Sequence, residues 1–301
     1  MTMDAGARTY VDRVNAGLPI WEVPLDEVRR AVDAETIEIF GPVDDVATVE
    51  DRSIEGVRVR IYRPEGDRPL PAVVYLHGGG WAVGSIESHD PVCRALAARA
   101  PALVVSVDYR LAPDHCFPAG LEDAWTATNW VASRLDELGA DRVVVAGDSS
   151  GGNLAAVVAL RARDRGVPLA LQVLIYPVTD CDLDSPGYLT HGVGLNLTRA
   201  KMEWYWGKYM NGADPAQPEA SPLRAELAGV APALIVTAEL DPLVFEGEEY
   251  ARRLEAAGVS VELRRYEGQI HGFVRLAALT PDAGRALDEI CVAIRAAREQ
   301  R

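Results

Sequence analysis

The amino-acid sequence predicts an α/β fold in which a mostly parallel sheet carries helices on both faces. Short apolar runs rich in β-branched residues recur along the chain, and amphipathic helical patterns separate them. Most of these runs are apolar throughout, as expected for strands that are buried on both faces. Strands that alternate with helices form doubly wound, mostly parallel sheets.

Seven strands are expected, and they are residues 57–62, 72–76, 103–107, 142–146, 171–176, 233–237 and 261–266. The first of them alternates apolar with polar residues, which predicts a half-exposed antiparallel strand at a sheet edge. Five amphipathic helices are expected between and after the strands, with apolar residues at i, i+3 and i+4. They are residues 88–99, 118–138, 152–163, 245–257 and 281–298.

Two segments interrupt this alternation. Residues 1–45 predict one or two helices before the first strand, and residues 179–229 hold several aromatic residues among turn residues. Insertions of this kind usually emerge at the carboxyl ends of strands, where ligands bind in open α/β sheets. We therefore expect N-terminal cap helices over residues 1–45 and an α/β domain over residues 46–301, with a cap insertion at about residues 179–229. The alternative is that both segments are additional packing layers.

Composition excludes several classes of protein. The net charge is −15, and no cluster of basic residues is available for nucleic-acid phosphates or an anionic membrane. The first residues lack the apolar core of a secretion signal, and no apolar run is long enough to span a bilayer. We expect a cytoplasmic protein that has neither nucleic-acid nor membrane partners.

Four cysteines are scattered along the chain, and none belongs to a Cys-x-x-Cys pair: Cys93, Cys116, Cys181 and Cys291. This spacing predicts neither a zinc site nor a disulfide framework. Free thiols in a reducing compartment are the simplest interpretation.

A candidate nucleophile, Ser149, lies in the run Gly147-Asp148-Ser149-Ser150-Gly151. The run follows the strand predicted at residues 142–146 and precedes the helix predicted at residues 152–163. A strand-to-helix turn this tight strains its central residue and projects the side chain over the sheet. The helix N-terminus also favours developing negative charge. The alternative is a phosphate-binding turn, but the lysine of a P-loop is missing.

A second glycine-rich run, His77-Gly78-Gly79-Gly80-Trp81, directly follows the strand predicted at residues 72–76. Acyl transfer places negative charge on the former carbonyl oxygen, and each backbone N–H that faces this oxygen contributes about 3 kcal/mol. Glycines let the chain turn its amides inward. We expect Gly78, Gly79 and Gly80 to supply the amides of an oxyanion hole; the alternative is a flexible turn.

His271 is the candidate base, because it follows the last predicted strand and obeys the chain order serine, acid, histidine. The other four histidines belong to the glycine run, precede Ser149 or lie in the predicted insertion: His77, His89, His115 and His191. Asp241, which follows the strand predicted at residues 233–237, is the candidate acid, and Glu239 is its nearest rival. Asp180, Asp182 and Asp184 follow an earlier strand. We expect Asp148 to accept a hydrogen bond behind the nucleophile.

Five ordered motifs together resemble the hormone-sensitive-lipase-like esterases, which are the bacterial family IV carboxylesterases, in the subgroup with Gly-Asp-Ser at the nucleophile turn. The motifs are residues 77–81, residues 108–113, residues 147–153, Asp241-Pro242-Leu243 and His271-Gly272-Phe273. The resemblance runs from about residue 46 to the C-terminus, and the N-terminal helices also resemble this family's cap.

The resemblance implies an α/β-hydrolase fold, no cofactor, and a triad of Ser149, Asp241 and His271. It also implies oxyanion donors at Gly79, Gly80 and Ser150, a preference for short-to-medium acyl esters, and a possible homodimer through the sheet edge. Glu239 matches a position that often supports the catalytic region. Two departures stand out: Ser150 replaces the usual alanine, and Asp114 replaces the glutamate that usually follows the motif of residues 108–113.

The predicted function is ester hydrolysis through an acyl-enzyme intermediate. Deacetylation of a particular small metabolite, lactone opening and amide hydrolysis use the same machinery. A non-catalytic small-molecule-binding protein on this scaffold is the alternative from another class. Six aromatic residues are candidates for the substrate pocket: Trp21, Trp81, Tyr188, Trp204, Tyr205 and Phe273.

Overall fold

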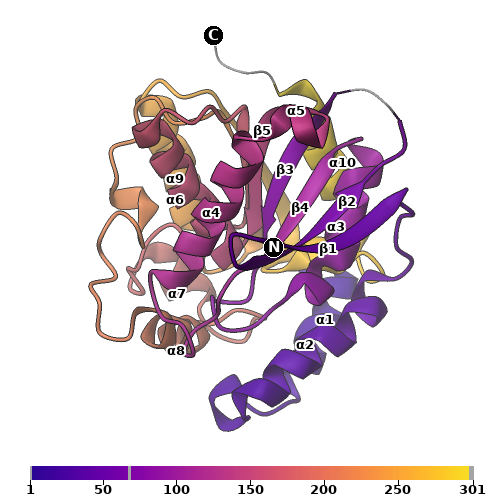
Figure 1. Cartoon of the computed structure of the whole chain (residues 1–301). Helices are drawn as coiled ribbons and strands as arrows, with labels where there is room; N and C mark the ends of the chain where they lie inside the picture. The colour runs from indigo at the N-terminus through magenta and orange to yellow at the C-terminus, as the bar shows by residue number, and fades with distance from the viewer. Residues whose placement is uncertain (1, 67–68, 298–301) are drawn as a thin grey trace.

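A sheet of eight strands runs through the protein, whose computed structural model describes residues 2–66 and 69–297 (Figure 1). The strand order is β1-β2-β4-β3-β5-β6-β7-β8. Strand β2 is antiparallel to both its neighbours, and β3 to β8 are parallel to one another. The strands are β1 Thr48–Ile54, β2 Val57–Arg63, β3 Leu70–Leu76, β4 Leu103–Asp108, β5 Ala140–Asp148, β6 Leu171–Ile175, β7 Ala233–Leu240 and β8 Val261–Ile270.

All seven predicted strands are confirmed, but one strand escaped prediction. Strand β1 exposes every residue except Ile54 and has no apolar alternation. The prediction that residues 57–62 form the sheet edge is therefore wrong, because β1 occupies that edge, whereas their antiparallel pairing is confirmed. A strand without a buried face gives no periodic signal in the sequence.

The five predicted helices are confirmed as α3 Ile86–Arg99, α4 Ala119–Ala132, α6 Ser150–Arg165, α9 Val244–Ala256 and α10 Pro281–Ala296. The segment expected as one helix at residues 118–138 instead ends at Ala132, and a separate short helix, α5 Leu135–Leu138, follows. Residue 298, at the expected end of the last helix, lies outside the described residues.

Successive residues of β3 point to opposite faces of the sheet, as a pleated strand requires. Val74 and Leu76 join the hydrophobic cluster that α4, α6 and α9 cover, and Val73 and Tyr75 join the cluster under α3 and α10. Both faces are therefore buried, which explains the continuous apolar runs in the sequence.

The two segments that interrupt the alternation lie together at the carboxyl ends of the parallel strands (Figure 1). The N-terminal segment contains α1 Ala5–Asn15, the short 3₁₀ turn Ile20–Glu22 and α2 Leu25–Phe40. The insertion contains α7 Pro186–His191, α8 Arg199–Met210 and the 3₁₀ turn Pro222–Arg224. None of the helices in the described part of the chain is long and apolar enough to cross a membrane.

Arg29 of α2 joins the N-terminal segment to the α/β domain. Its guanidinium donates to the carbonyl oxygens of Ala82, at 2.9 Å, and Ala112, at 3.0 Å, and binds the carboxylate of Asp114 at 2.8 Å. Asp114, which departs from the family motif, thus contacts α2. Arg110 of the same motif pairs with Asp123 at 2.8 Å instead.

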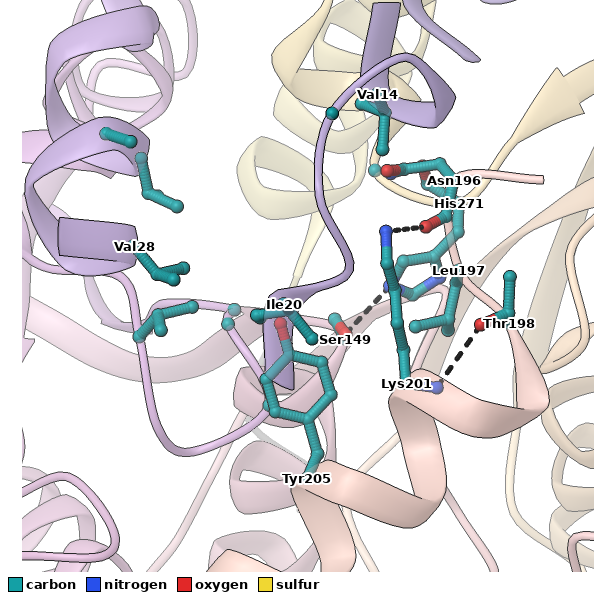
Figure 2. A pocket seen from close by; sticks show the side chains of 18 of the residues that line it. Val14, Ile20, Val28, Ser149, Asn196, Leu197, Thr198, Lys201, Tyr205 and His271 are labelled. Carbon is teal, nitrogen blue, oxygen red and sulfur yellow. Dashed lines mark hydrogen bonds between the residues drawn. The ribbon is translucent and has the colours of Figure 1, made fainter. Parts of the chain in front are cut away.

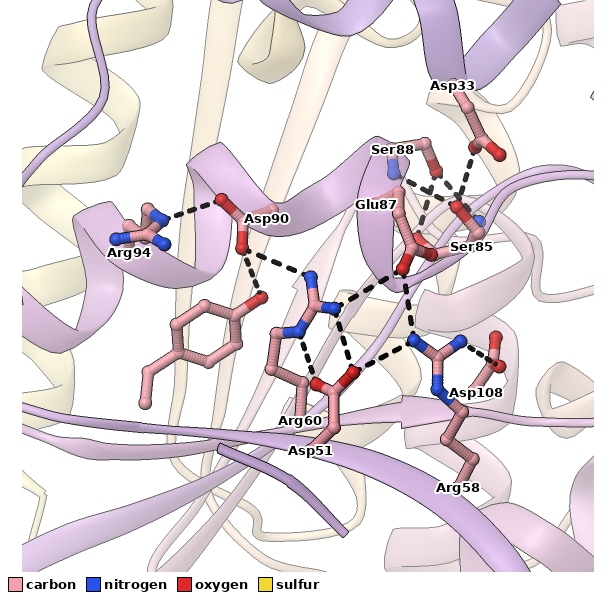
Figure 3. A network of polar contacts seen from close by, with 11 residues as sticks. Asp33, Asp51, Arg58, Arg60, Ser85, Glu87, Ser88, Asp90, Arg94 and Asp108 are labelled. Carbon is pink, nitrogen blue, oxygen red and sulfur yellow. Dashed lines mark hydrogen bonds and ion pairs between the residues drawn. The ribbon is translucent and has the colours of Figure 1, made fainter. Parts of the chain in front are cut away.

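A second junction lies at the start of α3. The hydroxyl of Ser85, which caps this helix, donates to Asp33 of α2 at 2.6 Å. The same end of α3 carries Glu87, which belongs to a network of ion pairs with Arg58 and Arg60 of β2 (Figure 3). The network therefore links α2, α3 and the antiparallel edge of the sheet.

Replacing Arg29 by methionine should loosen the N-terminal segment, because two carbonyl oxygens and one carboxylate lose their donor. We expect the opening free energy of α2 to fall by about 1–3 kcal/mol. Hydrogen exchange of the α2 amides measures this loss. Arg30→Met is the matched control, since Arg30 is exposed and makes no hydrogen bond or ion pair among the described residues. Equal exchange rates in the two variants would contradict the anchoring role.

Candidate active site

Ser149 occupies a strained turn between β5 and α6. Its φ of 57° and ψ of −120° lie in a region that non-glycine residues rarely adopt. Such strain costs about 1–3 kcal/mol and persists only where the surroundings enforce it. The Ser149 amide donates to the Ile175 carbonyl at 2.8 Å, and the Ser149 carbonyl accepts from Asn153 at 3.0 Å.

Two glycines allow this turn to approach the end of β3. A Cβ added at Gly151 would lie 1.9 Å from the Leu76 carbonyl oxygen, and one added at Gly147 would lie 2.3 Å from the Gly151 oxygen. Both obstacles are backbone atoms, which cannot turn aside as a side chain can. The spacing of glycines around Ser149 is thus a steric requirement of the fold.

Ser149, His271 and Asp241 form a continuous hydrogen-bonded chain. The Ser149 Oγ lies 2.8 Å from Nε2 of His271, and Nδ1 of His271 lies 2.6 Å from Oδ2 of Asp241 (Figure 2 shows the first contact). The other carboxylate oxygen of Asp241 accepts from the Leu243 amide at 2.9 Å, which fixes its orientation. Asp241 is fully buried, and His271 is almost so.

Glu239, the rival for the acid position, lies elsewhere. Its carboxylate is buried and accepts from the Gly268 amide at 2.7 Å. Glu239 therefore holds the end of β8, three residues before His271, without contacting the imidazole. Asp180, from the earlier strand, pairs with Arg224 at 2.6 Å. Among the candidate acids, the fold brings Asp241 to the histidine.

The structure brings the glycine run beside Ser149, with one correction to the prediction. The Gly78 amide donates to Asp148 at 2.9 Å, so it is not available to a ligand, and the expectation that Gly78 supplies an oxyanion donor is wrong. The amides of Gly79, Gly80 and Ser150 donate to no acceptor in the part of the chain described. Gly79 and Gly80 line the same cavity as Ser149.

Asp148 is a buried acceptor behind the nucleophile, as expected from the sequence. Besides Gly78, it accepts from the Tyr75 hydroxyl at 2.9 Å and lies 3.2 Å from Nε2 of His89. Burial opposes its ionisation, but His89 and the hydrogen-bond donors prevail and hold the pKa of Asp148 well below its usual value. Its carboxylate is therefore ionised at neutral pH and holds the glycine run in place.

His77, from the glycine run, is a neutral structural residue. Burial, and secondly the neighbouring His89, lower the pKa of His77 to about 3. Its ring stacks on Tyr109 at 4.3 Å, and the Tyr109 hydroxyl donates to the His77 carbonyl at 2.7 Å. The hydrogen bond from Tyr109 to the His77 carbonyl fixes the backbone immediately before the glycines.

A cavity of about 650 Å³ lies over Ser149, which is an ordinary size for a small-molecule site. Mainly apolar residues of the N-terminal segment form one wall, and residues 196–205 of the insertion form the opposite wall. Two of the predicted pocket residues, Trp21 and Tyr205, line it. A Cβ at Gly80 would lie 2.2 Å from the Tyr205 ring, so the insertion packs directly against the glycine run.

Four other aromatic candidates do not line this cavity, so their prediction as pocket residues is corrected. Trp81 is buried and stacks on Tyr209 at 4.3 Å, and Tyr188 lies in the hydrophobic core. Phe273 packs against Tyr176 and Tyr266, and Trp204 lies against Lys208. On α8, neighbouring residues project about 100° apart, so the face that presents Tyr205 turns Trp204 away.

Asn196 is a site residue that sequence reasoning missed. Its side-chain amide donates to the His271 carbonyl at 2.9 Å, so the insertion contacts the histidine loop directly. No motif marks this asparagine, and the contact joins residues that are 75 positions apart. Only the packing of the insertion reveals it.

The described residues contain no group of three or more histidine, cysteine or acidic side chains that could hold a metal ion. The four cysteines are unpaired, and Cys93 and Cys291 are buried.

Gly151→Ala tests the steric account of the turn. Because the new Cβ would meet a backbone oxygen, we expect a loss of about 2 kcal/mol or more in the free energy of unfolding. Gly207→Ala is the matched control, since Gly207 is also helical and has no atom within 4 Å of an added Cβ. It should raise stability by about 0.5–1 kcal/mol. Urea denaturation measures both, and equal effects would refute the account.

Comparisons with known proteins agree with this architecture. A family model described as the α/β hydrolase fold matches residues 73–275. The carboxylesterase NlhH of Mycobacterium tuberculosis (strain ATCC 25618 / H37Rv) is 46% identical over 248 residues, which are 79% of this chain and 78% of that protein. The ethyl acetate hydrolase of Pseudomonas putida is 38% identical over 307 residues, 95% of this chain and 96% of that protein. The solved structure of a hyperthermophilic esterase from the archaeon Pyrobaculum calidifontis covers 98% of this chain and 99% of that one, at 40% identity and a TM-score of 0.91.

Proposed function

The chain belongs to the α/β-hydrolase family, and from this premise we propose that Ser149, His271 and Asp241 hydrolyse short-to-medium-chain carboxylic esters. Two relatives are named as a carboxylesterase and an ethyl acetate hydrolase. The reaction class of this chain is carboxylic-ester hydrolysis. The finer placement in the hormone-sensitive-lipase-like subgroup with Gly-Asp-Ser at the turn rests on Gly147, Asp148 and Ser149.

The observation that carries the proposal is the hydrogen-bonded chain from Asp241 through His271 to Ser149, with contacts of 2.6 and 2.8 Å. A serine hydroxyl is a weak nucleophile unless an adjacent base takes its proton. The buried Asp241 carboxylate favours the tautomer with a proton on Nδ1, which leaves Nε2 free to accept from Ser149.

In the proposed mechanism, His271 removes the Ser149 proton as Oγ attacks the ester carbonyl. The carbonyl π electrons move to oxygen, which accepts hydrogen bonds from the amides of Gly79, Gly80 and Ser150. Collapse of this intermediate breaks the bond to the alkoxide, and His271 returns the proton to the leaving alcohol. Water, deprotonated by His271, then releases the acid from Ser149 by the same route.

The cavity supports a preference for acyl chains of short to medium length. Its volume is about 650 Å³, and its walls come from two segments, residues 1–45 and 179–229, that we propose to act as a cap. The alcohol and acyl groups would lie between Trp21 on one wall and Tyr205 on the other. Deacetylation and lactone opening need the same groups, so an activity panel of esters, acetylated alcohols and lactones ranks these substrates. A cytoplasmic location and a homodimer through the sheet edge remain proposals.

Ser149→Ala should abolish turnover, because no other hydroxyl among the described residues forms a hydrogen bond with His271. We expect kcat for 4-nitrophenyl butyrate to fall by about 10⁴-fold or more, with an unchanged melting temperature. Mass spectrometry of the wild-type protein, quenched early, should find a butyryl adduct on Ser149. Full turnover by the variant would refute Ser149 as the nucleophile, whereas a wild-type protein without turnover or adduct would support the alternative of a non-catalytic binding protein.

Asp241→Asn and Glu239→Gln separate the two rival acids. The asparagine cannot orient the His271 tautomer, so kcat should fall by about 10⁴-fold. Glutamine at position 239 keeps an acceptor for the Gly268 amide, and the loss should stay below about tenfold. Steady-state kinetics on one neutral ester measures both. A larger loss in Glu239→Gln would assign the acid role to Glu239.

A further inference from the structure

Lys201 is a cation in the wall of the cavity that contains Ser149 and His271 (Figure 2). It lies on α8, and its Nζ donates to the backbone carbonyl of Asn196 at 2.7 Å. No carboxylate pairs with it in the part of the chain that the structure describes. The side chain is only partly accessible to solvent.

The choice of lysine at this position is unusual for this chain. Only two of its 30 basic residues are lysines, Lys201 and Lys208, and the rest are arginines. The ion pairs found among the described residues use arginine or histidine, and Lys208 lies over the Trp204 ring at 4.7 Å. Lys201 is therefore separate from the ion pairs that hold the scaffold together.

Other charged groups that line the cavity have partners or lie in solvent. Glu35 pairs with Arg13 at 3.1 Å, and Asp148 lies 3.2 Å from His89. Arg275 also forms no ion pair among the described residues, but it donates to the Thr36 hydroxyl at 3.4 Å and lies close enough to Asp148 to help lower the pKa of that carboxyl. Glu27 is exposed. The Lys201 ammonium has one neutral carbonyl as its partner among the described residues, and no carboxylate there is close enough to influence its pKa.

This position carries an energetic cost that a ligand can offset. Burial lowers the pKa of Lys201 from its usual value, and no neighbouring charge opposes the shift. An ammonium has three N–H donors, and Asn196 accepts from one of them, so two are available. A carboxylate that enters the cavity would accept a charge-assisted hydrogen bond, which is shorter and stronger than a neutral one.

We propose that the enzyme takes esters that carry a free carboxylate, such as hemiesters of short dicarboxylic acids, and that Lys201 binds this carboxylate. The inference rests on the proposed ester hydrolysis at Ser149. The backbone carbonyl of Asn196 accepts from Lys201, and the side-chain amide of Asn196 donates to the His271 carbonyl at 2.9 Å. Because this one residue links Lys201 to the histidine, we expect the substrate to be short. Lys201 acts on specificity and takes no part in proton transfer.

Matched ester pairs test the proposal. Ethyl butyrate and monoethyl succinate differ only in a terminal methyl or carboxylate on the acyl side. Propyl acetate and 3-acetoxypropanoate make the same comparison on the alcohol side. The quantity to measure, by pH-stat titration, is the ratio of kcat/KM for the charged ester to that for its neutral partner. The pair whose ratio responds to Lys201 identifies the side of the substrate that it binds.

Lys201→Met should lower this ratio by about tenfold or more in one of the two pairs, and Lys201→Arg should keep it within about threefold. Lys208→Met is the matched control on the same helix and should leave the ratio as in the wild type. An unchanged ratio in Lys201→Met for both pairs would overturn the inference. If the wild type hydrolysed neither ethyl butyrate nor propyl acetate, the proposed function itself would fail.

A second measurement does not depend on the stability of a Lys201 variant. Reductive ¹³C-methylation of the Ser149→Ala protein labels Lys201, Lys208 and the terminal amine, and keeps the charge of each. Saturation with the charged ester of the pair that responds to Lys201 should shift the Lys201 methyl signal and leave that of Lys208 in place, whereas the neutral ester of the same pair should shift neither. No shift of Lys201 with either charged ester would overturn the proposal.

Discussion

The close approach of the β5–α6 turn to the end of β3 is the constraint on which the site depends. Ser149 is held at a φ of 57°, and the carbonyl oxygen of Leu76 leaves room for a hydrogen atom but not for a methyl group at Gly151. The strained turn raises the Ser149 hydroxyl above the sheet, where His271 meets it. Because parallel strands end at one edge, the loops after β3, β5, β7 and β8 supply the other site residues there.

Asp148 extends this constraint to the glycine run. One buried carboxylate accepts from the Tyr75 hydroxyl in β3, from the Gly78 amide and from His89 in α3. The hydrogen bonds from these donors offset the free-energy cost of burying the Asp148 charge. As a result, the run is held by its first glycine, and the amides of the next two, which line the cavity, donate to no acceptor among the described residues.

The two segments beyond the strand ends contact the catalytic parts as well as covering them. Tyr205 packs on Gly80, and Asn196 bonds to the His271 carbonyl. Arg29 reaches the carbonyls of Ala82 and Ala112 from the other side. The walls of the cavity are therefore joined by hydrogen bonds and packing contacts to the residues that we propose as the catalytic groups, so a change in either segment can reach the site through these contacts.

The sequence by itself determined the strand order along the chain, the turn at Ser149, and His271 and Asp241 as candidates, because these follow from local spacing and from the known order of motifs. The sequence did not predict the exposed strand β1, because a strand without a buried face shows no alternation of apolar and polar residues. Only the tertiary structure decided that the Gly78 amide donates its hydrogen bond to Asp148, and that Tyr205 lines the cavity whereas Trp204 does not. It also decided that Lys201 lies there without a carboxylate partner. These outcomes depend on how segments far apart in the chain pack together, and no local periodicity records that packing.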